Sequence, residues 1–388
     1  DTRVLVTATG SKEAKDIDFF LLTVDYEEKM YAVGKMPGGF LRREGRPGNS
    51  AILNARLIDR PIRPLFDKRC RHDVHVVATV LSVEQDNAPE LCGMLGASAS
   101  LAISNIPWDG PIAGVRVGCV DGQYVNNPTQ EQLAASSMNI TVAGSETAIL
   151  MVEGGAKEVP EEQVLDAIMF GHEAIKKLVA FQKQIVAEAG KPKMELVFPE
   201  IPADIEQAIH DYAAGPLKDA IFNPDKLTRE AHMAEVRKEA EEHFKEIYPD
   251  NAADVDACLD HLTKSIVRHM ISVDKIRPDG RALDEIRPIT CEVGLLPRVH
   301  GSALFTRGQT QALTITTLAP MSETQIIDDL TTIKEKRYIH QYNFPSYSVG
   351  ETKGSRGPGR REIGHGALAE RALVPVIPSV EEFPYAIR

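Results

Sequence analysis

The sequence predicts an α+β protein in which two related α+β domains flank an all-helical domain. Short β-branched runs between Gly/Pro turns fill the first and last parts of the chain, as expected for strands and tight connections. The middle is charged, rich in Ala, Glu and Lys, and poor in β-branched residues. The last part also repeats the pattern of the first. We therefore expect domains at residues 1–190, 191–270 and 271–388.

The first domain opens on a strand-like run and alternates strands with two helices. The opening run at residues 4–9 predicts one strand, and further β-branched runs predict strands at residues 74–83, 114–120 and 139–142. One predicted helix, at 91–103, is rich in small residues. The other runs over 160–189, with Pro160 near its start and Gly190 after its end.

The middle domain carries apolar residues at helical spacing in three segments. These segments are 204–213, 229–248 and 252–270. Since none of them is flanked by strand patterns, we expect a small domain built from helices alone.

An internal repeat relates the third domain to the first. Thr2–Thr7 has the pattern of Thr310–Ile315, and Arg42-Arg43-Glu44 is echoed by Arg360-Arg361-Glu362. A helix-like stretch follows each arginine pair, and Pro61-Ile62 and Pro375-Val376 are expected to close the two helices. The second copy has a lead-in at 277–308 without a counterpart in the first, whereas the first copy runs on much further past its helix. We therefore expect a fragment in which the first copy lacks its beginning and the second its end.

Composition limits the class of protein. The chain has 388 residues and a formal net charge of −12, which argues against a broadly basic nucleic-acid surface. Contact with a polyanion must then come from local arginine clusters. Five cysteines are scattered without a CxxC pair, which indicates free thiols in a reducing compartment. No apolar run approaches the roughly 18 residues of a membrane span.

The first arginine cluster lies in a loop between glycines and prolines, residues 37–47. Arg42, Arg43 and Arg46 could present guanidinium groups to phosphate oxygens, and Phe40 could stack on an unpaired base. The alternative is a solvated loop or an intersubunit ion-pair patch.

The second cluster places Arg360, Arg361 and His365 at the start of a predicted helix, after a Gly/Pro-rich lead. Arginines beside a helix N-terminus form an anion site. His365 could donate a hydrogen bond to phosphate or stack on a base, although a lone histidine is more often structural.

Two further arginines are candidates with structural alternatives. Arg281 belongs to the Arg-Pro-Asp-Gly-Arg turn at 277–281, where Asp–Arg pairing is an equally good explanation. Arg63 follows a predicted helix in which Arg56, Asp59 and Arg60 are expected to form ion pairs, and it is itself a weaker candidate for the path of the phosphates.

These motifs together resemble the bacterial polynucleotide phosphorylase family over essentially the whole chain. The phrases that carry the resemblance include residues 40–47, 55–64, 277–281, 300–308, 342–345, 348–352 and 360–365. Leu41 stands where the family has a second phenylalanine.

The resemblance implies two ribonuclease PH-like domains, both truncated here, joined by an all-helical domain. It implies a homotrimeric ring around a channel for single-stranded RNA, which the loop with Phe40, Arg42, Arg43 and Arg46 would line. Arg360, Arg361 and His365 would be the catalytic motif beside the phosphate and the RNA 3′ end. Arg281 would belong to the domain's entry motif.

The implied activity is 3′-to-5′ phosphorolytic exoribonuclease action in mRNA degradation, with inorganic phosphate as co-substrate. The Mg²⁺ ligands would lie beyond Arg388, so we expect no metal site in this chain and little activity from the fragment itself. The resemblance also implies a cytoplasmic protein, outside the membrane, with degradosome components as further partners. Alternatives are a non-catalytic RNA-binding ring scaffold, a hydrolytic exoribonuclease, or arginine clusters that are only structural.

Overall fold

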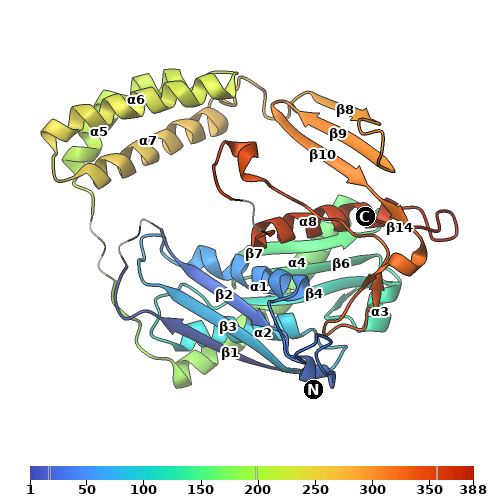
Figure 1. The fold of residues 1–388 in the computed structure, drawn as a ribbon. Helices are drawn as coiled ribbons and strands as arrows, with labels where there is room; N and C mark the ends of the chain where they lie inside the picture. The colour runs from blue at the N-terminus through green and yellow to red at the C-terminus, as the bar shows by residue number, and fades with distance from the viewer. Residues whose placement is uncertain (16, 18, 197, 199, 355–356) are drawn as a thin grey trace. The chain divides into compact units, whose positions relative to one another are not determined.

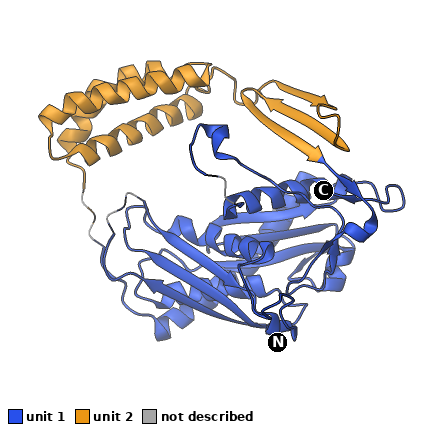
Figure 2. Cartoon of the chain, viewed as in Figure 1, with its two compact units in different colours: residues 1–197, 316–388 blue, residues 198–315 orange. Residues whose placement is uncertain are grey.

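The computed structural model describes residues 1–15, 17, 19–196, 198, 200–354 and 357–388. The chain divides into two compact units (Figure 2). Unit 1 comprises Asp1–Val197 and Thr316–Arg388, and unit 2 comprises Phe198–Ile315. Unit 1 thus joins the first copy of the repeat to the larger part of the second, while the lead-in of the second copy belongs to unit 2.

The first sheet of unit 1 has the strand order β1-β3-β2. Its strands are β1 (Arg3–Gly10), β2 (Leu22–Glu27) and β3 (Val74–Ser82). Strand β3 pairs antiparallel with β1 and parallel with β2. Because side chains alternate along a strand, β2 buries Leu22, Val24 and Tyr26 and leaves Asp25 and Glu27 on the other face.

Two helices complete the core on this sheet. They are α1 (Asn49–Ile62) and α2 (Pro89–Ile103), as Figure 1 shows. Ile58, Ile62, Val76, Met94 and Leu101 are fully buried between helices and strands. The predicted strand at 74–83 and helix at 91–103 are confirmed within a few residues.

The second sheet of unit 1 is antiparallel, with the order β5-β4-β6-β7. Its elements are β4 (Ala113–Val120), β5 (Gln123–Asn126), β6 (Met138–Gly144) and β7 (Ile149–Ala156), with α3 (Gln130–Ala135) between β5 and β6. The long helix α4 (Glu161–Ala189) packs on this sheet through Ile175 and Val179. Pro160 and Gly190 cap it, as predicted.

The second-copy part of unit 1 contains short strands and one helix. Strand β11 (Leu318–Ala319) pairs with β14 (Ala386–Ile387), and β12 (Gln325–Ile326) pairs with β13 (Glu335–Lys336). A 3-10 turn, η3, spans Met321–Glu323. Helix α8 (Arg360–Leu373) lies beside α1 in Figure 1 and packs on it: a side chain at Gly364 would meet the Arg56 guanidinium.

The internal repeat is visible in the backbone. Helices α1 and α8 each have 14 residues and each runs into a 3-10 turn, η2 (Arg63–Leu65) and η5 (Val374–Val376). Upstream, η1 (Met30–Val33) and η4 (Ser346–Val349) each end on a left-handed glycine, Gly34 with φ 69° and Gly350 with φ 73°. Positive φ favours glycine, so both copies use it at the same turn.

The predicted register of the repeat is wrong around the arginines. When the helices are aligned from their first residues, Ile52 matches Ile363 and Arg60 matches Arg371. Arg360 and Arg361 therefore correspond to Asn49 and Ser50, whereas Arg42-Arg43-Glu44 lies in the loop before α1. Pro61 and Ile62 are the last two residues of α1, as predicted, but the counterpart of Pro375 is Pro64 in η2.

Unit 2 contains the predicted helices and a sheet. The helices are α5 (Ala203–Ile221), α6 (Lys226–Ile247) and α7 (Ala252–Ser272), which bury Ile205, Ile209, Phe244 and Leu259. The sheet has the order β10-β9-β8, with β8 (Ile289–Val293), β9 (Gly301–Arg307) and β10 (Thr310–Thr316). Among the described residues, no helix is long and apolar enough to cross a membrane.

Candidate active site

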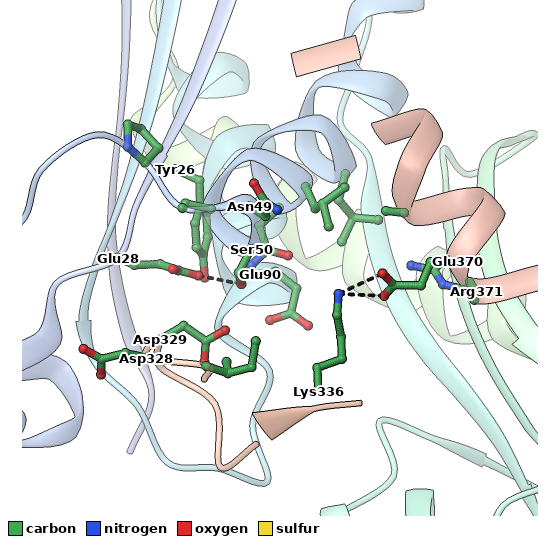
Figure 3. A pocket seen from close by; sticks show the side chains of 18 of the residues that line it. Tyr26, Glu28, Asn49, Ser50, Glu90, Asp328, Asp329, Lys336, Glu370 and Arg371 are labelled. Atoms are coloured by element: carbon green, nitrogen blue, oxygen red, sulfur yellow. Dashed lines mark hydrogen bonds and ion pairs between the residues drawn. The ribbon is translucent and has the colours of Figure 1, made fainter. Parts of the chain in front are cut away.

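A cavity of about 1620 Å³ opens in unit 1 between the two copies of the repeat. The first copy contributes residues from β2, the arginine loop and α1, and the second contributes Asp328, Asp329, Lys336 and part of α8. Figure 3 shows Glu28 bonded to Ser50 on one side of the cavity and Lys336 bonded to Glu370 on the other. Of the predicted site residues, Arg43, Arg46 and Arg360 line it.

Arg360 stands at the first position of α8 and is held by the first copy. Its Nη1 donates to the backbone oxygen of Val24 at 2.7 Å, and its Nη2 pairs with the Asp25 carboxylate. The other Asp25 oxygen lies 2.8 Å from Nε2 of His75. Burial opposes ionisation of Asp25, but the hydrogen bonds from Arg360 and His75 outweigh it and lower the pKa of that carboxyl.

Arg361 and His365 lie on the same helix without lining the cavity. The Arg361 side chain is exposed. His365 is half-buried, and its ring meets Tyr342 edge-on, with centroids 5.3 Å apart and planes at 66°. This contact fixes the ring one turn along from the two arginines.

The arginine loop of the first copy is anchored at one point and otherwise exposed. Glu44 accepts a hydrogen bond from the Met30 backbone at 3.1 Å. A hydrogen bond from its own backbone, together with the one from Met30, lowers the pKa of the Glu44 carboxyl. Phe40 is fully exposed, and Arg42 has a left-handed backbone with φ 50°. Within the described part of the chain, Arg43 and Arg46 form no ion pair. Arg42 has no ion pair there either, although its Nη1 donates to the Pro37 oxygen at 3.4 Å, so all three guanidinium groups can meet an anion.

Arg63 and Arg281 are already engaged. Arg63 pairs with Asp59, one turn earlier, at 2.6 Å and donates to the Leu22 oxygen at 3.0 Å. Arg281, in unit 2, pairs with Asp279 at 2.9 Å, and its side chain is only 14% exposed. The Arg281 contact is the Asp–Arg pairing stated as its alternative, whereas the pairing of Arg63 was not predicted.

The carboxyl groups on the cavity wall were not singled out from the sequence. Burial raises the pKa of Glu28 to about 7, although Ser50 Oγ donates to its carboxyl at 2.8 Å. Glu90 pairs with Arg116 at 2.5 Å. Tyr26 is buried beside them, and its hydroxyl has no hydrogen-bond partner among the described residues. The sequence signal for Glu28 was its place directly after β2, in which the acidic residues Asp25 and Glu27 alternate with buried ones.

One carboxylate joins the repeat-related helices. Oε2 of Glu153, on β7, lies 2.6 Å from Arg60 of α1, and Oε1 lies 3.1 Å from Arg371 of α8. Because Arg60 and Arg371 occupy equivalent positions in the two helices, a single side chain bonds both copies.

No group of three His, Cys, Asp or Glu residues in the described ranges could hold a metal ion.

Family models match nearly the whole chain in three parts. The model for "3' exoribonuclease family, domain 1" matches twice, over residues 1–107 and 285–388, which agrees with the internal repeat. Domain 2 of that family matches residues 110–174. The RNA binding domain of polyribonucleotide nucleotidyltransferase matches residues 204–282, the region of α5 to α7.

Curated relatives named polyribonucleotide nucleotidyltransferase are similar along the full chain. The protein from Heliobacterium modesticaldum is 60% identical, that from Syntrophomonas wolfei 57% and that from Enterococcus faecalis 55%, each over 100% of this chain. The chain spans about 55% of the length of these relatives. The duplicated domain, the helical insert and these similarities together show that the chain belongs to the 3′ exoribonuclease family, with the domain composition of a polyribonucleotide nucleotidyltransferase.

Proposed function

We propose that this chain is the RNA-handling core of a 3′-to-5′ phosphorolytic exoribonuclease. The reaction converts RNA and inorganic phosphate into RNA shortened by one nucleotide and a nucleoside 5′-diphosphate. The observation that carries the proposal is the placement of Arg360 and Arg361 on the first turn of α8, with Arg360 on the cavity wall, in a member of this family.

The reaction requires the protein to bind inorganic phosphate next to the last phosphodiester of the RNA, although both are anionic. A phosphate oxygen attacks the phosphorus of the last phosphodiester, the bond to the 3′ oxygen of the preceding ribose breaks, and that oxygen takes up a proton. One P–O bond forms as a similar one breaks, so the reaction should be reversible. Positioning and charge neutralisation therefore supply most of the catalysis.

The residues divide into two groups by position. Arg360 and Arg361, at the helix N-terminus, would bind inorganic phosphate, and His365 would donate to the phosphate or the terminal nucleotide. In the first copy, Arg42, Arg43 and Arg46 would bind the RNA backbone while Phe40 stacks on a base. Arg63, whose guanidinium group is engaged by Asp59 and by the Leu22 oxygen, would act as a support within unit 1.

The family resemblance supports further proposals about the full-length protein. The full-length protein would be a cytoplasmic homotrimer that acts on single-stranded RNA in mRNA degradation, with degradosome components as partners. The five cysteines are free thiols, in keeping with a reducing compartment. Mg²⁺ would be a cofactor, with its ligands expected beyond Arg388.

The test is a product assay with the full-length protein on poly(A). Phosphate-dependent release of nucleoside diphosphates, lost in Arg360→Ala/Arg361→Ala, is the expected result. Monophosphates would indicate a hydrolytic enzyme instead. RNA binding without either product would favour a non-catalytic scaffold.

A further inference from the structure

Arg360, a catalytic candidate in the second copy of the repeat, is bound by residues of the first copy. Both contacts of Arg360 named above, to the Val24 oxygen and to the Asp25 carboxylate, reach strand β2. The Arg360 side chain is still 47% exposed and Asp25 is 32% exposed. Neither contact uses Nε, so part of the guanidinium remains available to an anion from solvent.

Asp25 is in turn fixed by the neighbouring strand. His75 of β3 lies 2.8 Å from its second oxygen, and β2 and β3 are adjacent parallel strands. Because both oxygens of the Asp25 carboxylate are bound, its orientation is fixed. The carboxylate in turn fixes the orientation of the guanidinium group that it binds.

The positions that the repeat makes equivalent to Asp25 and Arg360 do not form an ion pair. The glycine-ended 3-10 turns align Asp25 with Gln341, and the helices align Arg360 with Asn49. A reciprocal contact between Gln341 and Asn49 would carry no charge, and Gln341 instead accepts a hydrogen bond from Arg388 at 2.8 Å. The ion pair is therefore not a packing feature that the duplication imposes on both copies.

Helix α8 is also attached to the rest of unit 1 near its other end. Arg371 pairs with Glu153 at 3.1 Å, and Glu370 binds Lys336 at 2.8 Å. With these anchors in place, the Asp25 contact chiefly sets the orientation of one side chain, Arg360, at the cavity wall.

We propose that Asp25, supported by His75, is a positioning residue that holds the Arg360 guanidinium in the orientation that binds inorganic phosphate. This inference rests on the proposed function. The copy that carries Asn49 and Ser50 in place of the arginine pair thereby still contributes to the site, because it fixes the arginine of the other copy.

The experiment measures steady-state phosphorolysis of poly(A) by the full-length protein and its Asp25→Asn variant. We expect the KM for phosphate to rise about two- to fivefold, the range of a half-exposed ion pair, with the KM for RNA unchanged. Asp25→Glu should restore much of the loss. The matched control is Glu146→Gln, which breaks the exposed Glu146–Lys183 pair elsewhere in unit 1 and should leave both constants unchanged.

A double-mutant cycle separates positioning from general destabilisation. In an Arg360→Lys background, which lacks the planar fork, Asp25→Asn should add no further change in the KM for phosphate. If Asp25→Asn fails to fold, His75→Ala takes its place, with a smaller shift in the same direction.

Two results would overturn the inference alone: a KM for phosphate in Asp25→Asn equal to that of the control, or effects of Asp25→Asn and Arg360→Lys that multiply independently. If the unmodified protein releases no nucleoside diphosphate, the proposed function fails and the inference fails with it.

Discussion

Replacing Glu28 with Gln should make unit 1 more stable at neutral and alkaline pH. Burial raises the pKa of Glu28 from 4.5 to about 7, so the folded protein keeps a proton that the unfolded chain releases. Below about pH 4.5 both states are protonated and the group has no effect. Stability is lost as the pH rises to about 7, and the loss amounts to about 3 kcal/mol.

The measurement is urea unfolding followed by tryptophan fluorescence at pH 5 and pH 8. Trp108 is the single tryptophan of the chain and is buried in unit 1, so its signal reports on that unit. Glutamine keeps the oxygen that accepts the 2.8 Å hydrogen bond from Ser50 and removes the charge. The advantage of Glu28→Gln over the unmodified protein should therefore grow by about 3 kcal/mol between pH 4.5 and pH 8, most of it above pH 5.

Glu27→Gln is the matched control one residue away. A hydrogen bond from Lys29, with another from Thr79, lowers the pKa of Glu27, so its removal should cost a little stability at pH 8. If Glu28→Gln and the unmodified protein lose stability in parallel over this pH range, then burial does not destabilise the Glu28 carboxylate, and the reasoning is refuted.

Three other predictions follow from the contacts of unit 1. Substituting Arg42, Arg43 and Arg46 together with Gln should weaken single-stranded RNA binding and reduce the slope of log K against log salt by about 2; an unchanged slope in a filter-binding titration would mean that the loop does not contact phosphates. Glu153→Gln should cost about 1–3 kcal/mol and speed amide hydrogen exchange in both α1 and α8, because Arg60 and Arg371 lose a shared partner; faster exchange in only one helix would contradict this. Thr129→Ala removes the side-chain oxygen that accepts from Gln132 N at the start of α3 and should lower stability by about 1 kcal/mol in urea unfolding, with Thr129→Ser close to the unmodified protein.

Periodicity and terminal residues were enough to predict most elements of the fold. The run at 74–83 alternates because one face of β3 is buried, and the structure gives Val74–Ser82. The helix predicted over 160–189 begins and ends where Pro160 and Gly190 cap it. These signals are local, so one sequence suffices to interpret them.

The register of the repeat needed the structure. The Arg-Arg-Glu sequence that the two copies share is only three residues long. It lies in a loop in the first copy and at the start of a helix in the second. Helix boundaries are set by the extended glycines before them, Gly48 and Gly359, and these align the two copies differently.

The site was predictable only in part, because a sequence pattern indicates contacts between residues that are close along the chain and not between residues that are far apart. The partner of Arg281 lies two residues away, so its pairing was a stated alternative. Arg63 pairs with Asp59, four residues earlier, and only Asp59 was expected to form an ion pair. The contact of Arg360 with Asp25 spans 335 residues, and no pattern within either copy indicates it.

Glu153 shows what tandem duplication in one polypeptide permits. A symmetric homodimer would carry every residue twice, so a change that suits one half would be forced on the other. Here one carboxylate accepts a hydrogen bond from each of two equivalent arginines, and among the residues that the structure describes no second carboxylate bonds both helices. Because the two copies are parts of one polypeptide, each can change independently. One copy can keep the reactive residues while the other provides the residues that position them.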